Sequence, residues 1–195
     1  MQHKQIYQTW GRILRGRRPV LALEITNKCP LSCPGCYAFN PDHVTGTSLG
    51  SIPDFSGDEL IAGVMEVLDR RKPLGLFLVG GEPLIRVKEI SRLLPEISRR
   101  GIQTEVVTSG VIPIPLEWNQ LEGIRVVVSI DGLQPDHDRR RKPATYERIL
   151  GNIRGRKVII HCTVTSQMAS QERALEQFVG YWSSLDEVQD IRFSL

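Results

Sequence analysis

Six short runs of apolar, largely β-branched residues recur along the chain, and segments with helical periodicity separate them. Runs such as VVVSI and VIIHC are almost continuously apolar, which is typical of parallel strands covered on both faces. Strands that alternate with crossover helices build right-handed βαβ units. The sequence therefore predicts an α/β fold, a partial TIM-like (β/α)6 barrel with parallel strands, and favours it over a flat doubly wound sheet. The predicted strands span residues 20–26, 74–81, 102–110, 124–132, 157–165 and 188–195.

The segments between these runs have the residue spacing of helices. Ser56 and Glu59 form a capping-box pattern at the start of the first segment, whose apolar residues follow i, i+3, i+4 spacing. In the second segment, Pro95 is expected to break the helix or to start its second half, and Gly101 to end it. The predicted helices span residues 56–70, 87–101, 116–121, 145–154 and 170–185. The last helix is expected to turn Ala174, Leu175, Phe178, Val179 and Trp182 inward.

The length of 195 residues suits a single domain with a sizeable core. We expect residues 1–19 to be an N-terminal extension and residues 20–195 to be the core domain. No covering helix follows the sixth predicted strand. We therefore expect either that a C-terminal part of the natural protein is missing from this sequence or that the sequence comprises a core domain alone.

Apolar segments long enough for a membrane or a secretion signal do not occur in the sequence. No run approaches the roughly 18 residues that a membrane helix needs. The run PVLALEI follows a basic segment, but it is too short for the apolar part of a signal peptide and lacks a cleavage site. The sequence thus predicts a cytoplasmic protein without a membrane span.

The charge of the chain is nearly balanced, with a formal net charge of +3. The basic runs RGRR, RRK and RRRK are scattered, and no aromatic residues lie between their charges. This pattern favours a solvated surface over a site for nucleic acid or for a phosphate-bearing substrate. A small-molecule or peptide substrate is therefore expected rather than a nucleic acid.

Three cysteines lie within eight residues, at Cys29, Cys33 and Cys36, and the fourth, Cys162, is far away in sequence. Cysteines this close in a reducing compartment chelate metals or carry out redox chemistry rather than form disulfides. A structural zinc ion would need a fourth ligand, from His43, His161 or Cys162. An iron–sulfur cluster held by three thiolates would instead leave one iron without a protein ligand and so open to a substrate or cofactor.

Further polar residues follow the predicted strands at the point where each strand ends. In βα barrels the C-terminal edge of the strands carries the active site, so these residues are expected to converge there with the cysteines. They are Gly80, Gly81 and Glu82 after the second strand, Thr108 and Ser109 after the third, and Ser129 and Asp131 near the end of the fourth. Their alternative roles are ordinary turns and caps.

The spacing C-x3-C-x2-C directly after the first strand resembles the signature of the radical S-adenosylmethionine (SAM) superfamily. The motif GGEP after the second strand and the segment VVVSIDG of the fourth resemble the next motifs of that superfamily, in the same order. The resemblance implies a radical SAM enzyme with two cofactors, a [4Fe–4S] cluster and SAM. It further implies reductive cleavage of SAM to a 5′-deoxyadenosyl radical that abstracts hydrogen from a substrate, with electrons from a donor such as flavodoxin or ferredoxin.

The resemblance also implies roles for single residues. Cys29, Cys33 and Cys36 would each bind one iron, and the amino and carboxylate groups of SAM would bind the fourth. Gly80 and Gly81, lacking a Cβ, would let the backbone approach the methionine part of SAM, and Glu82 would help to hold its ammonium group. Thr108 and Ser109 would lie near the ribose, and Ser129 near the methionine carboxylate or the ribose, with Asp131 close by.

One position departs from the family pattern. The family often has an aromatic residue between the second and third cysteines, against the adenine, where this chain has Gly35. We expect a backbone contact from Gly35 and a packing role for Tyr37, which follows the motif.

Other polar residues are expected to be structural. Cys162 lies in an apolar strand and is predicted to be a small buried residue. His161 and Thr163 alternate with it and are expected to be satisfied core residues, and His137 to be a loop or helix-entry residue. Two alternatives to an enzyme stay open: a non-catalytic metal- or SAM-binding module on the same fold, and an electron-transfer protein, which would want a fourth cysteine nearby.

Overall fold

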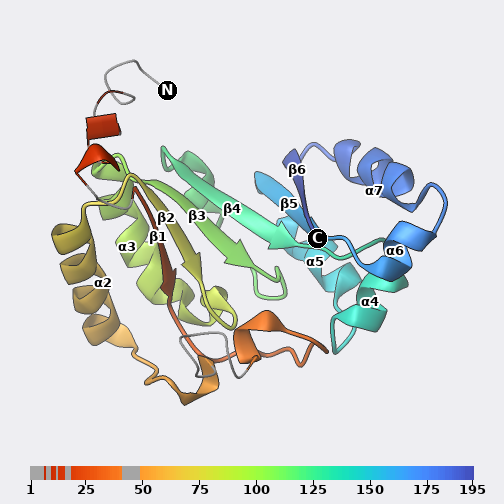
Figure 1. Cartoon of the computed structure of the whole chain (residues 1–195), viewed down its shortest axis with the longest axis horizontal. Coiled ribbons are helices and arrows are strands. Elements are labelled where there is room, and N and C mark those ends of the chain that lie inside the picture. The colour runs from red at the N-terminus through yellow and green to blue at the C-terminus, as the bar shows by residue number, and fades with distance from the viewer. Residues whose placement is uncertain (1–6, 8–9, 12, 16–18, 41–48) are drawn as a thin grey trace.

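The computed structural model describes residues 7, 10–11, 13–15, 19–40 and 49–195. These residues form one sheet of six parallel strands in the order in which they occur along the chain. Strands β1 and β6 are the two edges of the sheet, so the barrel is open between them (Figure 1). The strands are β1 (Val20–Glu24), β2 (Gly75–Val79), β3 (Gln103–Thr108), β4 (Ile124–Ser129), β5 (Val158–Thr163) and β6 (Val188–Ser194). The predicted partial (β/α)6 barrel with parallel strands is confirmed.

Helices cover the outer face of the sheet (Figure 1). Strand side chains such as Leu78, Val106 and Ile160 are fully buried against them in one continuous apolar core. The long helices are α2 (Gly57–Arg71), α3 (Val87–Arg99), α5 (Tyr146–Ile153) and α7 (Ala174–Ser183). Shorter ones are α4 (Asp136–Arg140), α6 (Ser166–Ser170) and the 3-10 turns η1 (Tyr37–Phe39), η2 (Leu49–Ser51), η3 (Pro83–Arg86) and η4 (Leu116–Gln120).

The inner face of the sheet carries charged side chains that meet across the barrel. Nη1 of Arg192 on β6 lies 3.0 and 2.9 Å from the two carboxylate oxygens of Glu105 on β3. Nη2 of Arg125 on β4 lies 3.1 Å from the same carboxylate. Two strands separate β3 from β6, so this contact fits a curved sheet whose inner side chains point toward one another. A flat doubly wound sheet is therefore not the architecture.

The helix predictions hold with some corrections. Ser56 stands at the N-cap of α2, but its side chain makes no capping hydrogen bond, so the predicted capping box does not form. Oε1 of Glu89 on α3 accepts the N–H of Gly57, the first residue of α2, at 2.9 Å. Pro95 does not break α3, which runs continuously from Val87 to Arg99 with Pro95 on its exposed face. Gly101 ends that helix as predicted, with φ at +69°.

The inward face predicted for the last helix is only partly right. Phe178 and Trp182 are fully buried, and Ala174 packs against the core. Leu175 and Val179 are 41% and 38% exposed, so the prediction was wrong for them. None of the described helices is both long and apolar enough to cross a membrane.

Candidate active site

The three clustered cysteines lie in a loop that leaves β1, here called the cysteine loop (residues 27–36). Their thiols form no disulfide and are half-buried. Sγ of Cys29 accepts the Leu31 N–H at 3.5 Å, and the carbonyl of Cys33 accepts the Cys36 N–H at 3.2 Å. Burial raises the pKa of the Cys29 thiol, and the Glu82 carboxylate and the neighbouring cysteines raise it further. Metal binding at Cys29 would therefore displace a proton.

The base of the cysteine loop packs directly against the turn after β2. Gly81 N–H donates to the Thr26 carbonyl at 2.9 Å, and Glu82 N–H donates to the Lys28 carbonyl at 2.8 Å. A Cβ at Gly80 would lie 2.5 Å from the Thr26 oxygen, and one at Gly81 would lie 2.3 Å from the Lys28 oxygen. The GG pair is thus required for the close approach of two backbones. Its predicted contact with the methionine part of SAM stays a prediction.

A buried carboxylate also supports this base, at a position that the sequence did not mark. Oδ1 of Asp54 accepts hydrogen bonds from the Thr26 hydroxyl at 2.7 Å and from the Asn27 N–H at 3.1 Å. Its other oxygen pairs with Arg86 at 2.5 Å. These hydrogen bonds and the guanidinium outweigh the effect of burial and lower the pKa of Asp54. No motif surrounds Asp54, so no sequence signal could have found it.

Glu82 of the GGEP motif is fully buried and connects two strand ends. Its carboxylate accepts the Leu84 N–H at 2.9 Å, the Thr108 hydroxyl at 2.6 Å and the Ser109 N–H at 2.8 Å. The Ser109 hydroxyl donates to it as well. The hydroxyl groups of Thr108 and Ser109 therefore have a structural partner. Contact of all three residues with SAM stays a prediction.

Replacing Glu82 with alanine should destabilise the protein strongly. The substitution leaves two hydroxyls and two backbone N–H groups without their buried acceptor, and we expect the free energy of unfolding to fall by about 3 kcal/mol. Urea denaturation followed by circular dichroism would measure the change. Glu66→Ala, which removes an exposed carboxylate from α2, should change it by less than about 0.5 kcal/mol. Equal effects of the two substitutions would contradict this role of Glu82.

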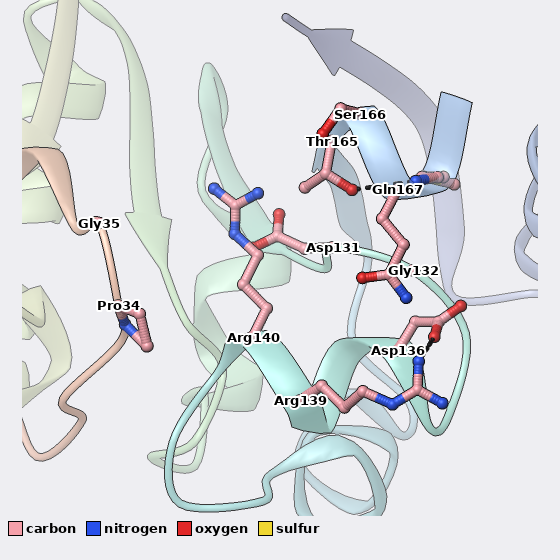
Figure 2. Close-up of a pocket in the computed structure, with 11 residues that line it drawn as sticks. Pro34, Gly35, Asp131, Gly132, Asp136, Arg139, Arg140, Thr165, Ser166 and Gln167 are labelled. Atoms are coloured by element: carbon pink, nitrogen blue, oxygen red, sulfur yellow. Dashed lines mark hydrogen bonds and ion pairs between the residues drawn. The ribbon is translucent and has the colours of Figure 1, made fainter. Parts of the chain in front are cut away.

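Asp131, after β4, is the centre of a second polar cluster (Figure 2). Its Oδ2 lies 2.9 Å from Nε of Arg141 and 3.2 Å from Nε of Arg140, and its Oδ1 accepts the Thr163 N–H at 3.2 Å. The prediction that the run RRRK is solvated was wrong for Arg140 and Arg141, because both side chains contact Asp131. The signal that could have found them is their position, shortly after a strand that ends in SIDG.

His137 stabilises the turn after β4 that contains Asp131. The ring is fully buried, and its Nδ1 accepts the Asp131 N–H at 3.2 Å. The proton is then on Nε2, which lies 3.0 Å from the Thr145 hydroxyl. The residue lies on α4, as the helix-entry prediction had it, and is closed off from solvent. Burial, aided by Arg141, lowers its pKa to about 4.

This pKa makes the stability of the protein depend on pH through His137. Below pH 6.5 the imidazole of the unfolded chain is protonated, whereas that of the folded chain stays neutral down to about pH 4. The free energy of unfolding therefore falls as the pH drops below 6.5. Between pH 7 and pH 5 we expect His137 to account for a loss of about 2 kcal/mol. In His137→Asn the side chain does not titrate, so the stability difference from the wild type should shrink by that amount at pH 5. A difference that urea denaturation finds constant between the two pH values would contradict the prediction.

A cavity of about 400 Å³ brings most of the predicted site residues together. Cys29, Cys33, Cys36, Gly35, Gly80, Gly81, Thr108, Ser109, Ser129 and Asp131 all line it. Arg140 and Arg141 line it too. Glu82 supports it from the buried side. The side chain of Tyr37 lies outside the part of the chain that the structure describes.

The inner side chains of β5 also reach this cavity. His161 and Thr163 line it, so the expectation that they are satisfied core residues was wrong. Partial burial lowers the pKa of His161, and Arg141 and Arg192 lower it further. Cys162 points to the opposite face, is fully buried as predicted, and has its pKa raised to about 12 by burial.

The donor set fits an iron–sulfur cluster better than a zinc ion. Among the described residues, no three His, Cys, Asp or Glu side chains surround one common ion position, as zinc would require. Of the three possible fourth ligands, Cys162 faces away from the cavity, and His43 lies outside the described residues. His161 lines the cavity but does not group with the cysteines around one ion position. A cluster takes each thiolate at a separate iron, which suits three thiols spread along one cavity wall.

Comparison with known proteins identifies the family. The model of the radical SAM superfamily matches residues 23–168, and the chain belongs to this superfamily. Its members use a [4Fe–4S] cluster and SAM. A pre-heme d1 synthase of Dinoroseobacter shibae is 32% identical over 184 residues, which cover 86% of this chain and 42% of the relative. A PqqA peptide cyclase of Rhizobium meliloti is 32% identical over 134 residues, which cover 66% of this chain and 32% of the relative.

Solved structures agree on the fold. SuiB of Streptococcus suis, bound to its precursor peptide SuiA, superposes with a TM-score of 0.68 at 16% identity, covering 97% of this chain and 43% of SuiB. Native anSMEcpe with bound AdoMet superposes with a TM-score of 0.66 at 17% identity, covering 89% of this chain and 50% of that one. The chain spans less than half the length of the pre-heme d1 synthase and of the PqqA peptide cyclase.

Proposed function

We propose that this chain is the catalytic core of a radical SAM enzyme that acts on a small molecule or a peptide. The observation that carries the proposal is a single cavity lined by three free cysteines, the GG turn and a cationic wall. Bound there, the cluster and SAM would supply one-electron radical chemistry that removes a hydrogen atom from the substrate. The residues of the chain would bind and orient the cofactors and the substrate and would exclude water from them.

In this proposal Cys29, Cys33 and Cys36 hold one iron each. The backbone of Gly80 and Gly81 lies on the cavity wall beside them, within reach of the methionine part of SAM. Arg140 and Arg141 contribute two positive charges to the wall, and Asp131 neutralises one. The remaining positive charge favours an anionic cluster and the methionine carboxylate.

A second cavity, of about 430 Å³, lies between Pro34 and Gly35 of the cysteine loop and the segments around α4 and the start of α6 (Figure 2). Pro34, Gly35, Asp131 and Arg140 line both cavities, and Thr165 and Gln167 complete the second one from the start of α6. This adjacency supports the predicted contact between Gly35 and the adenosyl part of SAM. The exposed, side-chain-free backbone of Gly35 leaves room for a flat base there.

The partners of the proposed enzyme follow from its chemistry. Cleavage of SAM consumes an electron, so the enzyme needs a one-electron donor such as flavodoxin or ferredoxin, and we place it in the cytoplasm. The name of one relative states a peptide as its substrate, and one structural neighbour was solved with its precursor peptide. These two favour a peptide for this chain. The non-catalytic module is the alternative that the experiment below separates from an enzyme.

Anaerobic reconstitution with iron and sulfide tests the proposal. We expect about four irons and matching sulfide per chain, and 5′-deoxyadenosine on addition of SAM and dithionite. Iron and sulfide assays, electron paramagnetic resonance (EPR) and chromatography of the nucleosides provide the measurements. A fully loaded cluster that yields no 5′-deoxyadenosine would leave the non-catalytic module, and one zinc with no sulfide would overturn the cluster itself.

A further inference from the structure

Two different parts of the fold form backbone hydrogen bonds with the cysteine loop and its base. Its base is held by the turn after β2, through the N–H groups of Gly81 and Glu82. Its middle is held from the other side, because the Ser32 N–H donates to the carbonyl of Lys142 at 2.9 Å. Ser32 directly precedes Cys33, so this second bond fixes the backbone between the first and second cysteines.

Lys142 belongs to a short segment after α4, residues 140–142, that Asp131 holds in place. The Asp131 side chain is 1% exposed, and Oδ2 contacts Nε and Nη2 of Arg141, both at 2.9 Å, and Nε of Arg140 at 3.2 Å. A planar guanidinium bound through two nitrogens has little freedom to rotate. The backbone next to Arg141, including the Lys142 carbonyl, is therefore restrained by a carboxylate on another strand end.

Asp131 is itself fixed on two sides. His137 accepts its N–H at 3.2 Å, and its Oδ1 accepts the N–H of Thr163 at the end of β5, also at 3.2 Å. A continuous series of contacts thus runs from β4 and β5 through Asp131 and Arg141 to Ser32. The hydrogen bonds and ion pairs of this series measure 2.9 to 3.2 Å, and Asp131 at its centre is buried.

We propose that Asp131 is a positioning residue for the cysteine loop, acting through Arg141 and the Lys142 carbonyl. Where it concerns the cluster, this inference rests on the proposed function; where it concerns the loop, it stands on the contacts alone. Removing the charge of Asp131 leaves Arg140 and Arg141 as neighbouring cations without a counter-charge. Their repulsion moves the segment, and the bond between Lys142 and Ser32 opens.

Hydrogen exchange in the metal-free protein tests the loop directly. In Asp131→Asn we expect the Ser32 amide to exchange at least tenfold faster than in the wild type, while amides of α3 keep their rates. Asp136→Asn is the matched control, since it removes a carboxylate from α4 whose partner, Arg139, is 59% exposed and is not part of the contacts between Asp131, residues 140–142 and Ser32. It should leave the Ser32 amide unchanged. A Ser32 rate in Asp131→Asn within twofold of the wild type would overturn the proposal.

Two variants of Arg141 test the proposal independently, in case Asp131→Asn does not fold. Arg141→Gln removes the link without leaving a repelling pair and should also speed exchange at Ser32, whereas Arg141→Lys keeps the charge and should restore part of the protection. Equal protection at Ser32 in both Arg141 variants and the wild type would overturn the proposal.

Reconstituted protein gives a further readout. Asp131→Asn should take up less iron per chain and show a shifted or broadened EPR spectrum of the reduced cluster before SAM is added. An unchanged spectrum with full iron content would contradict positioning of the cluster. Failure of the wild type to cleave SAM, with Ser32 exchange still dependent on Asp131, would count against the proposed function and leave the positioning role supported.

Discussion

Serine in place of Cys29, Cys33 and Cys36 together is expected to give a folded chain that binds no cluster. The serine hydroxyl is a poor iron ligand at neutral pH, whereas the thiolates are the only soft donors on the cavity wall among the described residues. Iron and sulfide after reconstitution should fall to background, and 5′-deoxyadenosine should not form. The fold should persist, because the three thiols are half-buried and isosteric with the new hydroxyls.

Cys162→Ala provides the matched control for this experiment. Its thiol is fully buried on the opposite face of β5, near Sδ of Met168 at 3.8 Å. The variant should lose some stability through a small cavity but should keep its cluster and its SAM cleavage. Iron bound by the triple serine variant, or iron lost in Cys162→Ala, would show that the cluster is not where we place it.

Replacing Gly81 with alanine should have the second largest effect. Its new Cβ would lie 2.3 Å from the Lys28 oxygen and 2.7 Å from the Lys28 carbonyl carbon, and neither backbone atom has room to yield. The two turns must separate, which also breaks the bond between Glu82 N–H and Lys28. We expect the free energy of unfolding to fall by about 3 kcal/mol or more. Because Cys29 follows Lys28, cluster content should fall as well.

Gly63→Ala in α2 tests whether this effect is specific. A Cβ at Gly63 meets nothing within 4 Å, and alanine is the better helix former by about 1 kcal/mol. Urea denaturation should therefore show Gly63→Ala to be as stable as the wild type or more so. If Gly81→Ala unfolds at the same urea concentration as the wild type, the close approach of the two backbones does not contribute to stability as argued here.

The strands and their order could be predicted from the sequence because burial on both faces of a parallel sheet leaves near-continuous apolar runs. The same logic placed the site, since parallel strands that end at one edge bring their following residues together. Both steps depend on local pattern and on the handedness of βαβ units, which hold wherever a chain alternates strands and helices.

Contacts between segments that are distant in the sequence could not be predicted. The contacts of Asp54 with the cysteine loop have no local signature. Arg141 does follow the strand that ends in SIDG, but the charge run RRRK has the same pattern whether it faces solvent or a buried carboxylate. Leu175 and Val179 were placed inward by spacing alone, whereas the fully buried residues of α7 are Phe178 and Trp182, whose rings pack together while Phe178 also packs against Phe193 of β6. Such outcomes depend on tertiary packing, which periodicity does not encode.

The alternation of side chains along β5 has a practical consequence for chemical labelling. His161 and Thr163 face the cavity, so Cys162 between them faces the core, where its pKa of about 12 leaves almost no thiolate at neutral pH. An alkylating reagent added to the native, metal-free protein should therefore modify three of the four cysteines. Mass spectrometry of the alkylated chain then reports on the cysteine loop alone, and a fourth label marks molecules that have unfolded.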